Sequence, residues 1–168
     1  PAYWTFTLEV DGVPEGEICL SVPGRHNVYN ALAAAAGALR LGATPAQCRA
    51  GLLAFAGTGR RYEVLGQNRG VTIADDYAHH PAGLKALLPA TAEMGYGAVW
   101  AVFHPYTFSR TEMLLGHFAE VLPIADHVVM TAIMGGRESP GDWDITTQDL
   151  ADRMPGSVWF ETQEEVAR

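Results

Sequence analysis

The stretch that decides the fold is AVWAVFHPYTFSRTEMLLGHFAEVLPIADHVVMTAIM, residues 98–134. Residues 98–105 are an apolar run that predicts a buried strand, residues 109–125 predict a helix, and residues 126–134 predict a second strand. Alternation of strands and helices is typical of a parallel sheet with helices packed on its faces. The stretch therefore predicts an α/β fold.

The alternation continues on both sides of this stretch. The pattern predicts a hairpin, two further helices, a strand and the start of a last helix, over residues 61–77, 81–95, 146–154, 156–160 and 162–168. Together these elements predict a Rossmann-like, mostly parallel sheet flanked by helices.

The first third of the chain has a different pattern. Two strands joined by a turn and then two helices are predicted over residues 3–12, 17–24, 25–42 and 44–55. The flexible segment GTGRR, residues 57–61, marks the predicted domain boundary. We therefore predict one domain piece over residues 1–56 and a second over residues 57–168.

The composition suits a folded protein. Hydrophobic residues make up 48% of the 168 positions and charged residues 18%, which allows a core and argues against disorder. The net charge of −8 argues against general nucleic-acid binding, and no apolar run approaches the roughly 20 residues that span a bilayer. Residues 18–62 nevertheless contain arginines but no Asp or Glu, which suits a phosphate-bearing ligand. Cys19 and Cys48 are expected to be reduced thiols.

Ionisable side chains gather where predicted strands end. Residues 75–80, which read DDYAHH, and residues 104–110 and 133–138 all fall at such ends. Ligands of parallel sheets bind beyond the carboxyl ends of the strands, so one crevice could gather all three segments.

Three interpretations of DDYAHH are open. Asp75, Asp76, His79 and His80 could bind a divalent metal, because carboxylates and imidazoles form a common ligand set. The same polar groups could simply cap the strand end. A carboxylate there could also accept hydrogen bonds from both hydroxyls of a ribose.

RHNVYN, residues 25–30, is a second candidate for nucleotide binding. Asn27 and Asn30 are three residues apart at the start of a predicted helix and share a face, with His26 beside them. Side-chain amides offer a donor and an acceptor together, which suits an adenine edge. The alternative is that Asn27 caps the helix and Asn30 is merely exposed.

Three arginines suit anions. Arg60 and Arg61 follow glycines and could bind a phosphate in a bidentate fork. Arg110 lies at the start of a predicted helix, where Ser109 and Glu112 predict a capping box. The helix dipole favours anions there, so an isolated cation is unfavourable and we expect a carboxylate or phosphate partner.

Motifs of several enzyme classes are absent from these residues. The chain has no Walker loop, and its single lysine, Lys85, lies in a predicted helix with no glycine loop before it. It also lacks G-x-S-x-G, HExxH and CxxC. If the chain handles ATP, we expect the phosphate loop in another part of a longer protein.

Four ordered motifs resemble the C-terminal part of the Mur ligases, most closely their alanine-adding branch: PGRHNVYNALAAAA, GTGRRYEVLG, VTIADDYAHHP and FHPYTFSRTEMLLGHFAEVLPIADHVVM. The resemblance implies a three-domain, cytoplasmic bacterial ligase of peptidoglycan synthesis. Residues 1–56 would be the end of a P-loop-type central ATP-binding domain. Residues 57–168 would be the Rossmann-like C-terminal domain, truncated before its last strands.

The resemblance also implies a reaction. ATP activates the carboxylate of UDP-N-acetylmuramic acid as an acyl phosphate, and the amine of L-alanine displaces the phosphate. The ligands of the required Mg²⁺ are expected mainly in the remaining domains of the parent chain, and no metal site is expected in these residues. The fragment is expected to be inactive alone, and neither nucleic acid nor a membrane is an expected partner.

Motif matches imply the roles of individual residues. For ATP, Asn27 and Asn30 match the asparagines that meet the adenine, with His26 beside them. Asp76 matches the carboxylate that binds the ribose, and Arg61 matches the arginine that orients the phosphates.

Substrate-binding roles are implied for Tyr77, His79 and Arg110, with Arg110 holding the alanine carboxylate. Arg61 and His79 are the implied catalytic residues. The motif departs from the usual pattern at His104, Tyr106 and Thr107, which leaves the amino-acid specificity open. A murein tripeptide recycling ligase of the same family, a non-catalytic nucleotide-binding module and a metal-dependent phosphatase are the alternatives.

Overall fold

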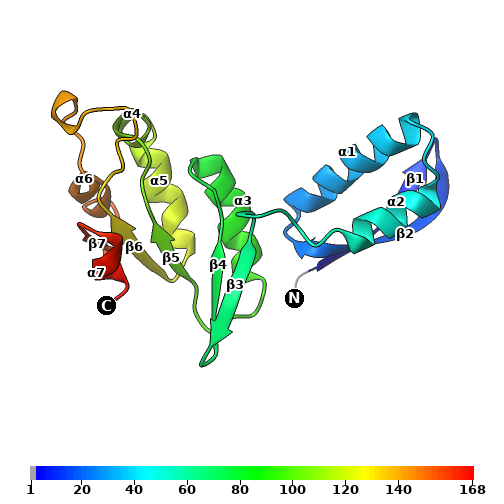
Figure 1. Ribbon diagram of the computed structural model, residues 1–168, viewed down its shortest axis with the longest axis horizontal. Coiled ribbons are helices and arrows are strands. Elements are labelled where there is room, and N and C mark those ends of the chain that lie inside the picture. Colours follow the sequence, from blue (N-terminus) through cyan, green and yellow to red (C-terminus); the bar gives the residue numbers. More distant parts are fainter. Residues whose placement is uncertain (1–2) are drawn as a thin grey trace. The chain divides into compact units, whose positions relative to one another are not determined.

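The computed structural model describes residues 3–168, and the chain folds into two compact units (Figure 1). The first unit ends at Tyr77 and the second spans Ala78–Arg168. Among the described residues, no helix combines the length and the apolar character that a membrane span needs.

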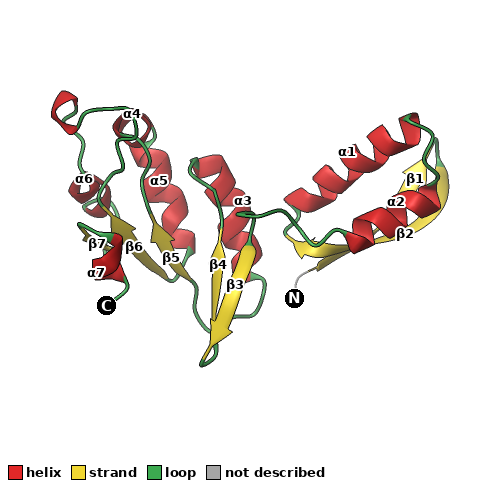
Figure 2. Cartoon of the chain, in the orientation of Figure 1, coloured by secondary structure: helices red, strands yellow, loops and turns green. Residues whose placement is uncertain are grey.

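An antiparallel hairpin with two helices packed on it forms most of the first unit (Figure 2). Strand β1 (Tyr3–Val10) pairs with β2 (Val13–Pro23) across Asp11–Gly12, whose φ angles of 51° and 81° are those of a type I′ turn. Helices α1 (His26–Arg40) and α2 (Pro45–Ala54) follow. These elements confirm the order predicted from the sequence.

The core of this unit lies between the hairpin and the helices, and it contains Leu8, Ile18, Leu20, Ala31, Ala35 and Cys48. Helix α2 begins at a capping box, in which Thr44 and Gln47 satisfy each other's backbone N–H groups, with Pro45 in the first turn. Cys19 is exposed, Cys48 is buried, and both thiols are free.

A second hairpin completes the first unit. Strand β3 (Glu63–Asn68) pairs antiparallel with β4 (Val71–Asp75) across Arg69–Gly70. Both turn residues have positive φ, 50° and 84°, again the type I′ geometry. The hairpin predicted over residues 61–77 is therefore confirmed.

The second unit contains a parallel sheet in the order β5–β6–β7, formed by Trp100–Phe103, His127–Thr131 and Val158–Phe160. This confirms the predicted α/β architecture. The helices of this unit are α3 (Pro81–Ala92), α4 (Phe108–Met113), α5 (Leu115–Val121), α6 (Thr147–Ala151) and α7 (Gln163–Val166), with 3₁₀ turns at Leu122–Ile124 and Pro140–Asp142.

One face of this sheet packs against helices α3, α5 and α6. The core contains Leu84, Leu88, Phe103, Phe118, Val121, Leu122, Ala125, Val128, Met130, Leu150 and Met154. Phe103 of β5 and Phe118 of α5 meet at its centre, with ring centroids 5.2 Å apart.

The single helix predicted over residues 109–125 is wrong. The chain forms α4 and α5 in its place, and Leu114 between them has φ −109° and ψ 14°. Gly116 follows this break and Pro123 falls in the 3₁₀ turn after α5. Glycine and proline have the lowest helix propensities, so both residues weaken a continuous helix over this segment.

Candidate functional site

The start of α1 is tied to the end of β2 by asparagine side chains. Asn27 Nδ2 donates to the carbonyl of Pro23 over 2.6 Å, and Asn30 Nδ2 donates to Asn27 Oδ1 over 3.0 Å. Asn27 thus has a local structural role, but it is not the cap that the alternative predicts: Arg25 is the N-cap of α1, and no side chain caps the helix. Asn30 and His26 are exposed, and Asn30 Oδ1 accepts no hydrogen bond from any residue that the structure describes.

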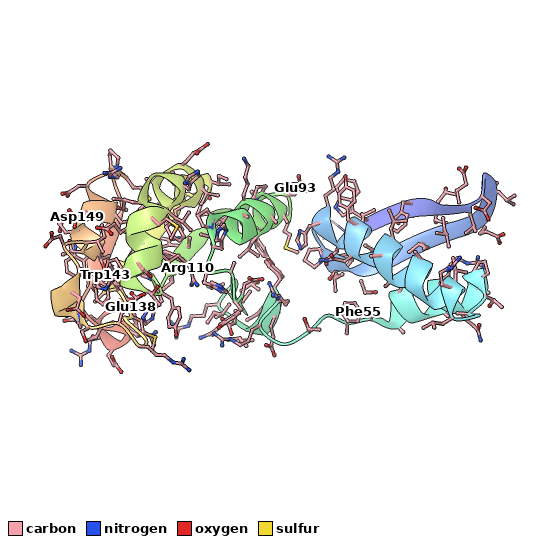
Figure 3. All side chains as sticks on the ribbon, turned by 90° about the horizontal axis from the view of Figure 1, so that it is seen from above. Phe55, Glu93, Arg110, Glu138, Trp143 and Asp149 are labelled. Atoms are coloured by element: carbon pink, nitrogen blue, oxygen red, sulfur yellow. The ribbon has the colours of Figure 1, made fainter. Side chains whose placement is uncertain are left out.

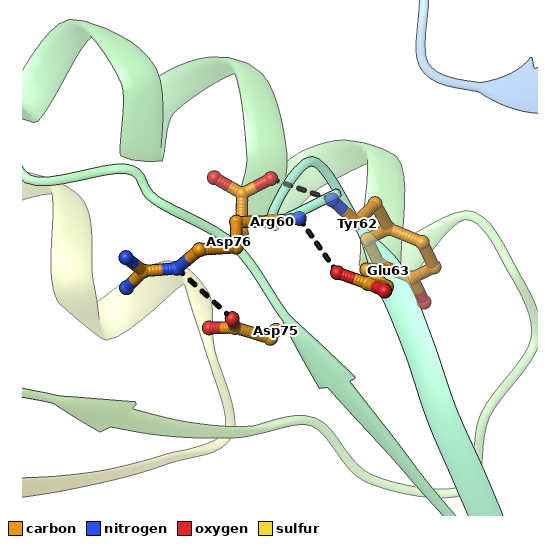
Figure 4. Close-up of polar contacts among 5 residues, drawn as sticks. All are labelled: Arg60, Tyr62, Glu63, Asp75 and Asp76. Atoms are coloured by element: carbon orange, nitrogen blue, oxygen red, sulfur yellow. Dashed lines mark hydrogen bonds and ion pairs between the residues drawn. The ribbon is translucent and has the colours of Figure 1, made fainter. Parts of the chain in front are cut away.

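A network of hydrogen bonds joins the segment before β3 to the end of β4 (Figure 4). Asp76 Oδ2 accepts a hydrogen bond from the N–H of Tyr62 over 2.8 Å. Glu63 Oε2 accepts one from the N–H of Arg60 over 2.7 Å, and Arg60 Nε forms an ion pair with Asp75 Oδ2 at 3.2 Å. The predicted ribose-binding carboxylate, Asp76, is therefore held in place by the backbone of the facing segment.

The backbone of this segment is strained. Arg60 and Tyr62 have φ angles of 57° and 47°, a region that costs about 1–2 kcal/mol for residues other than glycine. The N–H of Arg60 donates a hydrogen bond to the Glu63 carboxylate, and the N–H of Tyr62 donates one to the Asp76 carboxylate. Such strained positions are concentrated at functional sites in proteins.

The two adjacent arginines have different surroundings. Arg60 is bonded to Asp75, and its guanidinium carbon lies 4.6 Å from the ring centroid of Tyr77. Arg61 is exposed, and its guanidinium makes no hydrogen bond or ion pair with any described residue. Of the pair, Arg61 is the one whose guanidinium is not engaged by a described residue, and its predicted role at the ATP phosphates stays a prediction.

The DDYAHH segment leads from the first unit into the second. Tyr77 donates its N–H to the carbonyl of Arg60 over 2.8 Å, and His79 is half-buried. His80 is the N-cap of α3, where its Nδ1 accepts the N–H of Ala82 over 3.2 Å. Among residues 3–168 no group of three or more His, Cys, Asp and Glu side chains is arranged to hold a metal ion.

Within the second unit, the loops that follow β5 and β6 lie against each other. The N–H of Met134 donates to the carbonyl of Pro105 over 2.9 Å, and Tyr106 forms an isolated parallel bridge with Met134. Two of the three segments expected to converge, residues 104–110 and 133–138, are therefore brought together by the sheet.

A carboxylate from the β6 loop, that of Glu138, occupies the start of α4; Glu138 and Arg110 are labelled in Figure 3. Glu138 Oε2 accepts the N–H of Ser109 over 3.0 Å, and Glu138 Oε1 accepts its hydroxyl. The Ser109 hydroxyl, above all, and then the backbone N–H of Ser109 lower the pKa of Glu138 below its ordinary value. Glu138 is therefore an ionised anion at neutral pH.

The predicted capping box of Ser109 and Glu112 is wrong. Helix α4 begins one residue earlier, with Thr107 as N-cap, so Ser109 lies inside the first turn. Its donors reach Glu138, which is 29 residues away in the sequence. No local sequence pattern marks Glu138 for this role; only the alternation of strands, which places the two loops at one sheet edge, could have indicated it.

Arg110 follows Ser109 in the chain, is half-buried and forms no ion pair with Glu138. Its Nη1 donates to the carbonyl of Tyr106 over 3.0 Å, and its guanidinium carbon lies 5.9 Å from the centroid of the Tyr106 ring. Arg110 forms no ion pair with any residue that the structure describes. The anionic partner expected for Arg110 is not found among the described residues, because the carboxylate at the helix start, Glu138, bonds Ser109 instead.

The three positions that depart from the usual motif lie in these loops. Thr107 Oγ1 lies 3.2 Å from Ser109 Oγ, and Tyr106 lies beneath Arg110. His104 Nδ1 lies 2.7 Å from Nε2 of Gln163, which belongs to α7. Of the three, Tyr106 is the one that contacts Arg110.

The chain is similar in sequence to a family of known proteins. Residues 60–168 match the sequence model of the family described as "Mur ligase, glutamate ligase domain". The UDP-N-acetylmuramate–L-alanine ligase of Lachnospira eligens is 43% identical over 150 residues, which are 89% of this chain and 32% of that protein. The ligase of the same name from Clavibacter michiganensis subsp. michiganensis is 46% identical over 137 residues, 80% of this chain and 29% of that protein.

The fold is similar to a solved ligase structure. The crystal structure of UDP-N-acetylmuramate-alanine ligase from Thermotoga maritima superposes with a TM-score of 0.75 at 29% identity, covering 98% of this chain and 36% of that one. The chain thus spans about a third of the length of these relatives. The matched family model covers well over half of the described residues, and the chain belongs to the Mur ligase family.

Proposed function

We propose that this chain is part of the ATP-dependent, cytoplasmic bacterial ligase that joins L-alanine to UDP-N-acetylmuramic acid. The names of the relatives support the reaction. The structural observation that carries the proposal is the contrast between Arg60, which Asp75 and Tyr77 hold, and Arg61, whose guanidinium has no partner among the described residues. A strained segment that presents one free arginine suits the binding of a polyphosphate.

On the ATP side, Asn30 and His26 meet the adenine, Asp76 meets the ribose and Arg61 orients the phosphates. Support comes from the exposure of Asn30 and His26 and from the hydrogen bond that fixes Asp76 to the N–H of Tyr62. Asn27 acts through Asn30, because its own amide bonds Pro23 and Asn30. Arg61 contributes by stabilising the negative charge on the phosphoryl group that is transferred.

On the amino-acid side, Arg110 holds the carboxylate of alanine. Its guanidinium is tied at one nitrogen to the Tyr106 carbonyl, which leaves other donors for a bidentate bond to a carboxylate. Tyr77 and His79 complete the surroundings of the substrates, and His79 orients the attacking amine. The activation barrier of amide-bond formation falls because the amine and the activated carboxyl group are held close together and the developing charge is neutralised.

The magnesium ion that accompanies ATP neutralises phosphate charge when it is bound. The described residues contain no acidic cluster that fits it, so we assign its ligands to other parts of the parent chain and derive no step from it here. We further propose that residues 1–56 belong to the central ATP-binding domain and residues 57–168 to the C-terminal domain.

Alanine-dependent phosphate release by the full-length protein tests the proposal. Arg110→Ala should raise the KM for alanine roughly 10- to 100-fold, because a charge-assisted hydrogen bond contributes about 1.5–3 kcal/mol. The KM for ATP should stay nearly unchanged. Arg61→Ala should lower kcat and raise the KM for ATP.

Arg153→Ala and Arg40→Ala are matched controls, because each removes an exposed arginine from its respective unit. If Arg110→Ala raised the KM for alanine and the KM for ATP by the same factor, the proposed role of Arg110 would be wrong. Turnover with murein tripeptide but not with alanine would assign the chain to the recycling ligase. Nucleotide binding without any turnover would favour the non-catalytic module.

A further inference from the structure

Glu138 links the segment that carries Arg110 to the neighbouring loop. Both of its carboxylate oxygens are used on Ser109, one by the N–H group and one by the hydroxyl. Ser109 directly precedes Arg110 in the chain. A change at Glu138 would therefore release the residue from which Arg110 projects.

The other support of Arg110 also depends on the β6 loop. The Arg110 guanidinium is bonded to the carbonyl of Tyr106, and Tyr106 pairs with Met134. The Tyr106 hydroxyl lies 2.9 Å from the place where a Cβ on Gly136 would stand, so the ring packs directly on that glycine. Both contacts of Arg110 are thus fixed by residues of one loop.

The carboxylate oxygens of Glu138 bond Ser109 and not Arg110. Arg110 has no ion pair with any described residue. Glu138 and Arg110 are not paired, so the cation keeps its capacity for an external carboxylate. A bond between the two would instead have competed with the substrate.

We propose that Glu138 is a positioning residue for the amino-acid substrate: it holds Ser109, and through it fixes the direction in which Arg110 presents its guanidinium to the substrate carboxylate. The proposal rests on the proposed function and adds the residue that sets the geometry of the amino-acid site. Glu138 itself is not assigned a contact with substrate.

The test uses the full-length enzyme with Glu138→Ala, Glu138→Gln and Ser109→Ala. Glu138→Ala should raise the KM for alanine about tenfold and leave the KM for ATP within twofold, because a displaced Arg110 weakens carboxylate binding alone. Glu138→Gln keeps the shape and one acceptor oxygen, so it should recover most of the alanine affinity. The double variant Glu138→Ala/Ser109→Ala should raise the KM for alanine no more than Glu138→Ala alone, because both substitutions remove the same side-chain contact.

Glu112→Ala is the matched control, because Glu112 is an exposed carboxylate on the same short helix. If wild-type enzyme shows no alanine-dependent turnover, the proposed function fails. If wild type turns over but Glu138→Ala has the alanine KM of Glu112→Ala, the positioning role alone is overturned. Equal rises in the KM for alanine and for ATP, together with a lower melting temperature, would show that Glu138 only stabilises the fold and would also overturn the role.

Discussion

Replacing Gly135 by alanine should destabilise the junction between the β5 and β6 loops. A Cβ at Gly135 would lie 2.6 Å from the carbonyl oxygen of Glu138 and 2.8 Å from Cε2 of Phe108. Both separations are below the shortest normal contact of a Cβ atom. Since one of the two atoms belongs to the backbone, a change of rotamer cannot relieve the clash.

The loss of stability follows from the movement of the loop that the added methyl group would require. The N–H of Glu138 donates to the carbonyl of Gly135 over 3.1 Å, so moving the Glu138 carbonyl opens this turn. Overpacking of this kind costs about 1–3 kcal/mol. In a unit of this size, that loss lowers the melting temperature by roughly 5–15 °C. Because Glu138 moves with the turn, the KM for alanine should rise as well.

Differential scanning calorimetry of the full-length protein, with alanine kinetics on the same samples, measures both effects. Gly141→Ala is the matched control, because a Cβ at Gly141 meets no atom within 4 Å and its φ is not positive. If Gly135→Ala melts within a degree of Gly141→Ala and keeps the wild-type KM for alanine, the two loops do not pack as described and the reasoning is wrong.

Phe118→Ala should cost about 3–5 kcal/mol, because the ring is fully buried against Phe103, and urea unfolding should show a loss well above that of Phe118→Leu. Thr146→Ala should cost about 1 kcal/mol, measured in the same way, because its hydroxyl and Asp149 form the capping box of α6. The pKa of Glu138 is lowered from 4.5 in the folded state, so its contribution to stability is present above pH 4.5 and is lost as the pH falls through the folded pKa. The stability difference between wild type and Glu138→Gln, measured by urea unfolding across pH 3–7, should therefore shrink below pH 4.5; a constant difference would contradict this.

Local patterns in the sequence predict most elements of this fold. The turn residues Asp11–Gly12 and Arg69–Gly70 adopt the positive φ angles that join two antiparallel strands, and Thr44 caps α2 at the start of the helix predicted over residues 44–55. These features depend on residues within a few positions of one another, so spacing alone indicates them.

The same local reasoning fails at α4. Ser109 and Glu112 have the spacing of a capping box, but the donors of Ser109 bind Glu138 from another loop. A capping rule based on local spacing takes no account of a hydrogen-bond acceptor that is distant in the sequence. The network around Arg60 and Asp75 has the same origin, because 15 residues separate the two.

For this protein the sequence by itself determined the order of strands and helices, the parallel α/β class and the family motifs, because periodicity, turns and caps act over short distances. Only the tertiary structure decided which of the two adjacent arginines is free, which carboxylate holds Ser109, and what supports Arg110. Those choices depend on which strand ends become neighbours when the sheet forms, and that is settled by packing across the fold and not by neighbouring residues in the chain.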